Sequence, residues 1–216
     1  MNDLKILVIV PAYNEEDNIL NTYQSIIDYN KENNFNYINL PFNLGIGAAV
    51  QTGYKYAYYN DYDVAVQFDG DGQHDINYVS GIIDPIINNK CNMCIGSRFI
   101  DKKTKGFKSS ASRRIGIKLI SLLIRIFTRK KICDTTSGFR AVDKKIIRLF
   151  ANNYPTEYPE PVSTVAVLKR KLKVMEVPAV MHERVGGKSS IHAIKNVEYM
   201  INVTIAMFIE SIRRYK

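Results

Sequence analysis

Residues 64–75 read VAVQFDGDGQHD, and this stretch decides the fold class. Its first five residues are a short run of mostly apolar and β-branched side chains, which predicts a strand buried on both faces. Two aspartates, Asp69 and Asp71, follow directly, with a glycine between them and another after them. A buried strand that ends in a polar, glycine-rich turn is typical of α/β proteins, in which ligands bind at the carboxyl ends of the strands.

Segments on both sides of this stretch alternate between strand and helix patterns. Residues 4–10 (LKILVIV) predict a first buried strand, and the acids that follow Pro11–Asn14 predict the start of a helix. Further strands are expected at 37–40, 93–96 and 174–180, and further helices at 48–59, 78–87, 144–150 and 194–215. This order predicts one α/β domain over residues 1–216, built around a mostly parallel sheet.

Composition limits the classes of protein that need to be considered. The net charge of +9 predicts a polyanionic partner, which is a nucleic acid, an anionic membrane or a phosphate-bearing substrate. The chain carries no motif with aromatic stacking positions, so we expect no nucleic acid. It also shows no signal peptide and no uninterrupted apolar run of membrane-spanning length, which predicts a cytoplasmic protein that is not integral to the membrane.

Three cysteines, Cys91, Cys94 and Cys133, cannot form a closed disulfide framework. Cys91 and Cys94 have C-x-x-C spacing, but no second pair or suitably spaced histidine follows. We therefore expect free thiols in a reducing compartment, in preference to a zinc or redox site.

The acidic run has a chemical interpretation and a plain one. Two carboxylates at i and i+2, with glycine between them, can approach one cation together, because glycine lets the backbone bend close to a ligand. Their hard oxygens suit Mg²⁺ or Mn²⁺, which also bind substrate phosphates. The alternative is a surface turn rich in Asp and Gly. The position after a buried strand, with Gln73 and His74 next, favours the metal and diphosphate site.

Seven motifs spread over nearly the whole chain carry a family resemblance. They are VIVPAYNEEDNI (8–19), NLGIGAAVQTGY (43–54), FDGDGQHD (68–75), GSRF (96–99), DTTSGFRA (134–141), YPEP (158–161) and ERVGGKSS (183–190). In this order they resemble a family 2 glycosyltransferase of GT-A fold, in the branch of dolichol-phosphate mannose synthase and bacterial polyprenyl-phosphate hexose synthases. The resemblance implies a Rossmann-like three-layer sandwich and inverting transfer of a hexose from a nucleoside diphosphate sugar to a polyprenyl phosphate at the cytoplasmic membrane face.

The resemblance also assigns roles to residues. Residues 1–99 would form the nucleotide-sugar and metal half, 100–193 the acceptor half and 194–216 a C-terminal helix. Asp69 and Asp71 would bind the metal, and Asp71 and Gln73 would act in catalysis. The residues expected to contact the donor side are Pro11, Tyr13, Glu15, Gly45 and Gly47.

A lipid phosphate acceptor is already anionic at neutral pH, so it needs cations and no general base. We expect Ser137 and Arg140 to act in catalysis. The residues expected to bind the acceptor side are Arg98, Arg113, Arg114, Glu160, Arg184 and Lys188. The alternative for any one arginine is a solvated surface charge. A non-lipid acceptor, or a non-catalytic nucleotide-sugar-binding or scaffold protein, also stays open.

The sequence departs from the family pattern in two places. Relatives carry a strand with an Asp-Asp-Gly-Ser-like turn before the NLGIGAA motif, but only residues 30–36 fill that position here. If this segment is as short in the natural protein, we expect the sheet to lack one strand of the nucleotide site. Val162 stands where relatives often have an acid after YPEP, and Glu160, then Glu157, is the nearest substitute.

Two apolar helices predict contacts outside the site. Residues 115–132 carry apolar side chains with Arg and Lys on the flanks, which is typical of an in-plane helix on an anionic membrane surface. The alternative is a core helix. The C-terminal helix could also lie on the membrane, pack on a small membrane protein or form a homodimer. We expect His74 near the donor, and His182 and His192 in structural or surface positions.

Overall fold

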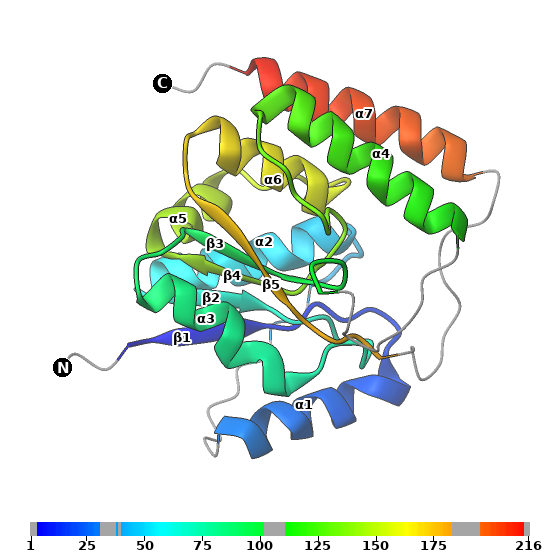
Figure 1. Cartoon of the computed structure of the whole chain (residues 1–216). Helices are drawn as coiled ribbons and strands as arrows, with labels where there is room; N and C mark the ends of the chain where they lie inside the picture. Colours follow the sequence, from blue (N-terminus) through cyan, green and yellow to red (C-terminus); the bar gives the residue numbers. More distant parts are fainter. Residues whose placement is uncertain (1–3, 31–37, 39, 102–110, 183–194, 214–216) are drawn as a thin grey trace.

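The computed structural model describes residues 4–30, 38, 40–101, 111–182 and 195–213 (Figure 1). The strands are β1 (Ile6–Ile9), β2 (Val64–Gln67), β3 (Met93–Ser97), β4 (Arg140–Asp143) and β5 (Val174–Pro178). The helices are α1 (Glu16–Asn30), α2 (Ile46–Tyr59), α3 (Val79–Ile87), α4 (Ala111–Thr128), α5 (Lys144–Asn152), α6 (Pro159–Lys169) and α7 (Lys195–Ile212), with a short 3₁₀ turn at Ile76–Tyr78 before α3.

The strands form a mixed sheet in the order β1-β2-β4-β3-β5. β1 pairs parallel with β2, and β3 pairs parallel with β5. β4 lies between these pairs and runs antiparallel to both of its neighbours. The predicted mostly parallel α/β sheet is therefore confirmed, with one reversed strand at its centre.

Alternate residues of the central strands supply two separate cores, as the two-residue period of a strand requires. Ala65, Ile95 and Val142 pack with α2, α5 and α6 on one face of the sheet. Val66, Cys94 and their neighbours pack against α3 on the other face, with α1 beyond it. Helices thus cover both faces of the sheet, which gives the predicted three-layer sandwich (Figure 1).

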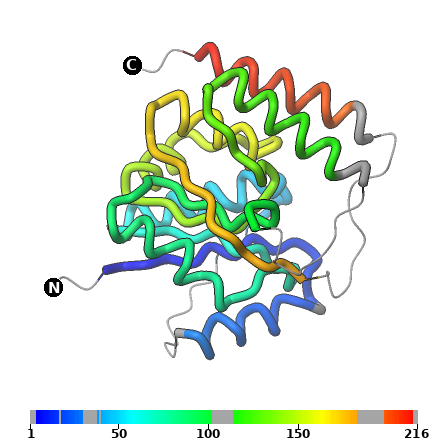
Figure 2. Tube along the Cα trace, in the orientation of Figure 1, coloured from blue at the N-terminus to red at the C-terminus, as the bar shows by residue number. Residues whose placement is uncertain are grey.

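An outer pair of helices covers α6. α4 and α7 lie side by side and run in the same direction (Figures 1 and 2). The Phe127 and Phe208 rings meet at a centroid distance of 6.1 Å. Glu210 of α7 is 3.7 Å from Arg170, just after α6, and 3.6 Å from Arg213. Apolar residues of both outer helices, including Ile120, Ile124, Val203 and Met207, belong to the core on this side.

The sequence predictions were wrong at several elements. β1 was expected to be buried on both faces, but Ile6 is 39% exposed, because β1 is an edge strand among the described residues. Ile38 and Leu40 lie in no strand, and the rest of the strand expected at 37–40 falls outside the described residues. The missing-strand prediction concerns residues 30–36, nearly all of which fall outside the described residues, so it stays a prediction. β4 and α6 were not predicted.

Candidate active site at the acidic turn

The acidic turn lies at the carboxyl end of β2, next to the segment that follows β1. Phe68 N–H donates to the Ile9 carbonyl over 2.9 Å, and Gly70 N–H donates to the Pro11 carbonyl over 3.4 Å. A side chain at Gly70 would lie 3.2 Å from that same carbonyl oxygen, so the glycine permits the close approach. The parallel pairing of β1 and β2 therefore brings the first and third sequence motifs together, as predicted.

The Asp69 carboxylate is held by protein groups on both of its oxygens. Gln67 Nε2 donates to Oδ1 over 3.2 Å, and His74 Nε2 lies 3.1 Å from Oδ2. The His74 ring stacks on Phe139, with 5.1 Å between ring centroids. Burial opposes the ionisation of Asp69, but the hydrogen bonds from His74 and Gln67 and the charge of Arg140 outweigh it, so the pKa of Asp69 is lowered. Asp69 is thus a fixed carboxylate whose position is set by its neighbours.

Gly138 explains why the fixed carboxylate fits there. A Cβ at position 138 would lie 2.3 Å from Asp69 Oδ2 and 2.8 Å from Oδ1, closer than side-chain carbons approach other atoms. The SGFR segment therefore needs glycine at its second position for a steric reason. His74, predicted near the donor, points inward to Asp69 and is 8% exposed.

The Asp71 carboxylate is held by backbone N–H groups, including Gln73 N–H at 3.1 Å from Oδ1. Burial raises the pKa of Asp71, and the nearby charge of Asp69 raises it further. Two carboxylates that repel each other favour a divalent cation between them, and their oxygens are the donors that Mg²⁺ or Mn²⁺ prefers. The described residues contain no group of three or more metal-binding side chains. The donor set fits a cation that keeps water or substrate phosphate as its other ligands.

Arg140 and Ser137, the residues expected to act in catalysis, lie beneath the site, each only 1% exposed. Arg140 Nε donates to the Ser137 carbonyl over 2.7 Å, and Nη1 lies 3.0 Å from both the Glu160 carbonyl and Ser163 Oγ. Ser137 Oγ donates to the Gly96 carbonyl over 2.7 Å. These contacts join β4 to the start of α6, so a direct role for either side chain in catalysis stays a prediction.

Glu160 lies at the first turn of α6, inside the same buried group. Burial raises the pKa of Glu160, while the charge of Arg140 lowers it and the charge of Asp69 raises it. Val162 is 6% exposed and belongs to the apolar core on the α6 side. Of these two positions, only Glu160 therefore brings an acid toward Asp69, in agreement with its choice as the nearest substitute.

Arg98 has a different environment from the one expected of a substrate ligand. Its Nε and Nη2 atoms contact the two oxygens of Asp134 at 2.8 Å and 2.7 Å, and Nη2 also donates to Thr136 Oγ1 over 3.0 Å. The Asp134 side chain is fully buried and that of Arg98 is 10% exposed. This bidentate pair ties the end of β3 to the 133–137 segment, and a contact of Arg98 with substrate stays a prediction.

The residues expected on the nucleotide side occupy two places. Pro11, Tyr13 and Glu15 follow β1, where Tyr13 is 65% exposed and Glu15 accepts a hydrogen bond from Asn18. Gly45 caps the start of α2 with φ of 85°, a backbone conformation that glycine adopts readily. Gly47 packs so closely that a Cβ would lie 2.4 Å from the Pro155 carbonyl oxygen. The structure brings Pro11 to the acidic turn, and the contacts of the others with a nucleotide stay predictions.

The remaining predicted residues are partly outside the described residues. Gln73 lies in the acidic turn, and its carbonyl accepts a hydrogen bond from His182 N–H over 2.8 Å. This contact fixes the chain just before the ERVGGKSS motif, although Arg184 and Lys188, like His192, fall outside the described residues. Arg114 is exposed at the start of α4, and the side chain of Arg113 is not among those described.

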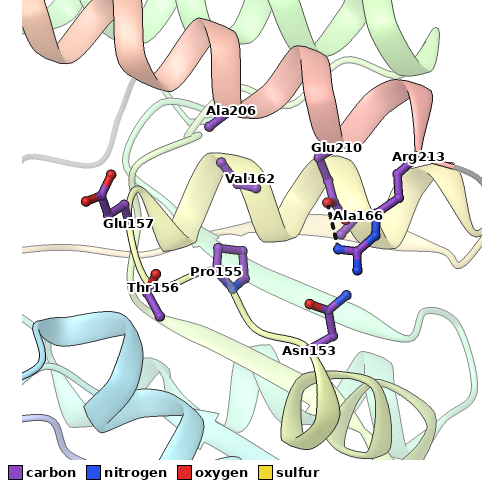
Figure 3. Close-up of a pocket in the computed structure, with 9 residues that line it drawn as sticks. All are labelled: Asn153, Pro155, Thr156, Glu157, Val162, Ala166, Ala206, Glu210 and Arg213. Carbon is purple, nitrogen blue, oxygen red and sulfur yellow. Dashed lines mark ion pairs between the residues drawn. The ribbon is translucent and has the colours of Figure 1, made fainter.

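A cavity of about 250 Å³ lies elsewhere, between α6, α7 and the segment after α5 (Figure 3). Its walls include Thr156, Glu157, Val162 and Arg213, and no residue of the acidic turn lines it. The Glu210–Arg213 ion pair lies at its edge (Figure 3). Glu157, the second substitute for the missing acid, is an exposed residue that lines this cavity.

Sequence reasoning missed three residues that shape the site. Gln67 holds Asp69 together with His74, which was expected near the donor. Gly138 leaves room for Asp69, and the Tyr154 hydroxyl lies 3.5 Å from Gln67 Oε1. The available signal was Gln67, a polar side chain in an otherwise apolar strand. No sequence pattern shows that Gly138 faces Asp69, since that contact joins the segment after β2 to the segment before β4.

Comparisons with known proteins identify the family. A family model described as glycosyl transferase family 2 matches residues 26–150. The chain is 31% identical to a UDP-N-acetylglucosamine–dolichyl-phosphate N-acetylglucosaminyltransferase of Methanococcus voltae, covering 82% of this chain and 86% of that protein. It is 26% identical to an undecaprenyl-phosphate mannosyltransferase of Micrococcus luteus, covering 74% of this chain and 66% of that protein.

Solved structures agree on the fold. Glucosyl-3-phosphoglycerate synthase of Mycobacterium tuberculosis, crystallised with Mn²⁺, uridine diphosphate and phosphoglyceric acid, superposes with a TM-score of 0.69. The match covers 99% of this chain and 81% of that one at 13% identity, so it speaks to the fold alone. The matched family model and the similarity to the Methanococcus voltae protein together show that this chain belongs to glycosyl transferase family 2.

Proposed function

We propose that this chain transfers a hexose from a nucleoside diphosphate sugar to a polyprenyl phosphate, with inversion at the anomeric carbon. The observation that carries the proposal is the acidic turn, where neighbouring side chains fix Asp69 and backbone N–H groups hold Asp71. The acceptor class is supported by the relatives named for transfer to dolichyl and undecaprenyl phosphate.

We assign Mg²⁺ or Mn²⁺ to Asp69 and Asp71. The like-charge repulsion that raises the pKa of Asp71 is the feature a divalent cation would relieve. The structurally similar synthase contains Mn²⁺ and uridine diphosphate. When bound, the cation supplies charge neutralisation for the departing diphosphate. Gln67 and His74 then orient the ligating carboxylate, as outer groups around a metal do.

The reaction needs no general base in this account. An oxygen of the lipid phosphate is already ionised, and it forms the new bond to the anomeric carbon. The bond from that carbon to the donor diphosphate breaks, and its electron pair leaves with the nucleoside diphosphate. The task of the protein is to hold two anionic groups close together, for which cations are required. Arg113, Arg114, Arg184 and Lys188 are the predicted cations, and Arg114 is exposed at the start of α4.

Ser137, Arg140 and Glu160 act in this proposal beneath the reacting groups. Arg140 joins the 137–140 segment to the start of α6, and its charge lowers the pKa of Asp69. The group therefore positions the carboxylate and sets its charge. We place the reaction at the cytoplasmic membrane face, in line with three cysteines that form no disulfide.

The test is a transfer assay with a panel of donors and acceptors. Purified protein with Mg²⁺ or Mn²⁺ receives UDP-glucose, UDP-N-acetylglucosamine or GDP-mannose, together with undecaprenyl phosphate, dolichyl phosphate or 3-phosphoglycerate. We expect a lipid-linked sugar with one donor, and a β-linked anomeric centre in the NMR spectrum of the product, because all three donors are α-linked. Sugar transfer to phosphoglycerate alone would reject the lipid acceptor.

The second candidate is a protein that binds nucleotide sugars without transferring them. The observation that favours it is the edge position of β1, because no second nucleotide-site strand follows β1 among the described residues. Nucleotide binding without product from any donor and acceptor would select this candidate and reject the transferase.

A further inference from the structure

The outer pair of helices leaves a broad apolar face uncovered. Exposed aliphatic and aromatic side chains recur every three or four residues on each helix, which places them in one stripe per helix. On α4 they are Ile115, Leu119, Leu122 and Ile126, and on α7 they are Ile201, Ile205, Phe208, Ile209 and Ile212. Each of these side chains is 45% to 69% exposed, so the stripes remain in solvent although both helices also contribute to the core.

The two stripes form one continuous surface. A Cβ built at Gly116 would lie 3.6 Å from the Met200 sulfur near the start of both helices. The Phe127 and Phe208 rings meet near their other ends. These two contacts hold α4 and α7 parallel and adjacent, as Figure 1 shows. We call the nine exposed residues of the preceding paragraph the α4–α7 face, and several apolar residues gathered on one face indicate an interaction surface.

Basic side chains border this face along α4. Lys118 and Arg125 of α4 are exposed and lie seven residues apart, one step round the helix from the apolar stripe. Arg129, Lys130 and Lys131 follow the end of α4 and are also exposed. The sequence of α4 contains no acidic residue. The two acids of α7 are Glu198 and Glu210, and Glu210 is 9% exposed and lies beside two arginines.

This charge pattern selects the occupant. A second copy of the chain would bring two rows of cations together across the apolar contact, which is unfavourable unless anions separate them. An anionic bilayer offers acyl chains to the stripes and negative head groups to the basic row, as in-plane amphipathic helices require. None of the described helices has the length and hydropathy needed to cross a membrane.

We propose that the α4–α7 face lies in the surface of an anionic membrane, with the apolar residues of both helices inserted and the basic row of α4 against the head groups. The starts of both helices lie toward the same side of the molecule as the carboxyl ends of β1 and β2 (Figure 1). A lipid phosphate in that membrane would therefore lie on the same side of the molecule as the acidic turn. The membrane contact itself does not depend on the proposed reaction.

Vesicle sedimentation of the full chain, without donor or acceptor, tests the proposal. We expect binding to vesicles of phosphatidylcholine with 30% phosphatidylglycerol, and at least tenfold weaker binding to phosphatidylcholine alone or in about 1 M salt. The double variants Leu122→Gln/Ile126→Gln and Ile205→Gln/Ile209→Gln should each weaken binding about tenfold or more. Lys118→Gln/Arg125→Gln should also weaken it about tenfold and reduce its dependence on anionic lipid.

Matched controls separate the face from general changes in charge or hydrophobicity. Leu20→Gln removes an apolar side chain that is 72% exposed on α1, and Lys145→Gln/Arg148→Gln removes two exposed cations of α5. Neither should change binding by more than about twofold. Equal weakening by controls and face variants would overturn the proposal.

Two further results would also overturn it. Equal binding to neutral and anionic vesicles would reject the role of the basic row. A dimer in sedimentation velocity that Leu122→Gln/Ile126→Gln converts to monomer would assign the face to a second copy. Transfer to a short, water-soluble prenyl phosphate should stay unchanged in the face variants. This last result separates a failed membrane contact from a failed transferase, because the soluble acceptor needs no membrane.

Discussion

Replacing Gly138 with alanine tests the link between the SGFR motif and the acidic turn. The added Cβ would lie 2.3 Å from Asp69 Oδ2, and ordinary contacts begin near 3.4 Å. The carboxylate must therefore move by about 1 Å, since it is the side-chain end of this contact and the backbones of β2 and β4 are paired. That shift breaks or lengthens the contacts with His74 and Gln67.

The expected effects follow from these contacts. Losing one hydrogen bond to a charged group lowers the unfolding free energy by about 1.5–3 kcal/mol. At this chain length that corresponds to a fall in Tm of roughly 5–10 °C. A displacement of about 1 Å in the metal-binding carboxylate should reduce kcat by about 100-fold. The loss of activity should therefore exceed what partial unfolding at 25 °C can explain.

Kinetics and thermal unfolding of one preparation measure both effects. Gly81→Ala is the matched control, because a Cβ there meets no atom within 4 Å and the position lies in α3. We expect Gly81→Ala to retain full activity and to gain up to about 1 kcal/mol in stability. If Gly138→Ala keeps kcat within about threefold of the wild type, the glycine of the SGFR motif is not needed to position Asp69.

Three other substitutions test separate parts of the account. Gly47→Ala places a Cβ 2.4 Å from the Pro155 carbonyl oxygen, so it should lower the unfolding free energy by about 1–3 kcal/mol in urea titration; an unchanged midpoint would contradict the close packing. Asp134→Asn leaves the Arg98 guanidinium without its buried counter-charge and should lower the unfolding free energy by about 3 kcal/mol, whereas a change below about 0.5 kcal/mol would show that water replaces the pair. Glu160 has a pKa raised chiefly by burial, so its neutral form is favoured in the folded state. Wild-type stability relative to Glu160→Gln should then fall as pH rises above about 4.5, and level off once the raised folded pKa is passed; a difference that is flat from pH 4 to 8, or of opposite slope, would contradict the buried position.

Strand and helix patterns predicted most elements because hydrophobic periodicity decides them locally. β2 is buried throughout, as VAVQF predicts, and α1, α2, α3, α5 and α7 lie close to their expected ranges. α6 was missed because PEPVSTVAVLK contains two prolines and many β-branched residues, which favour strand over helix in isolation. Pro159 at the first helical position and burial of nearly every side chain in α6 explain why tertiary packing overrides that preference.

β4 was missed for another reason. Its four residues, RAVD, have a charge at each end and give no alternation long enough to read. These residues can lie in the buried sheet because the Arg140 guanidinium donates hydrogen bonds to the Ser137 and Glu160 carbonyls. The same contacts bury Arg140, for which the sequence predicted a role in catalysis. Only the three-dimensional arrangement shows which groups this side chain contacts.

The candidate site was also predicted only in part, because some of its contacts join segments that are distant in sequence. Asp69, Asp71 and Pro11 were found from sequence because strand ends of a parallel sheet meet at one edge, and the structure places them together. The pairing of Arg98 with Asp134 was not predicted, because the two residues are 36 positions apart in sequence, and a contact of Arg98 with substrate stays a prediction. The division into halves at residues 99 and 193 stays a prediction.

Binding of nucleoside diphosphates with and without metal tests the central claim most directly. Calorimetric titrations with UDP, GDP, ADP and CDP would compare the wild type, Asp71→Asn and the control Asp84→Asn, which changes an exposed acid of α3. We expect one nucleotide to bind only with Mg²⁺ or Mn²⁺, and we expect Asp71→Asn to weaken that binding by about 100-fold while Asp84→Asn leaves it unchanged. Equal affinity with and without metal, or in wild type and Asp71→Asn, would contradict a metal and diphosphate site at the acidic turn.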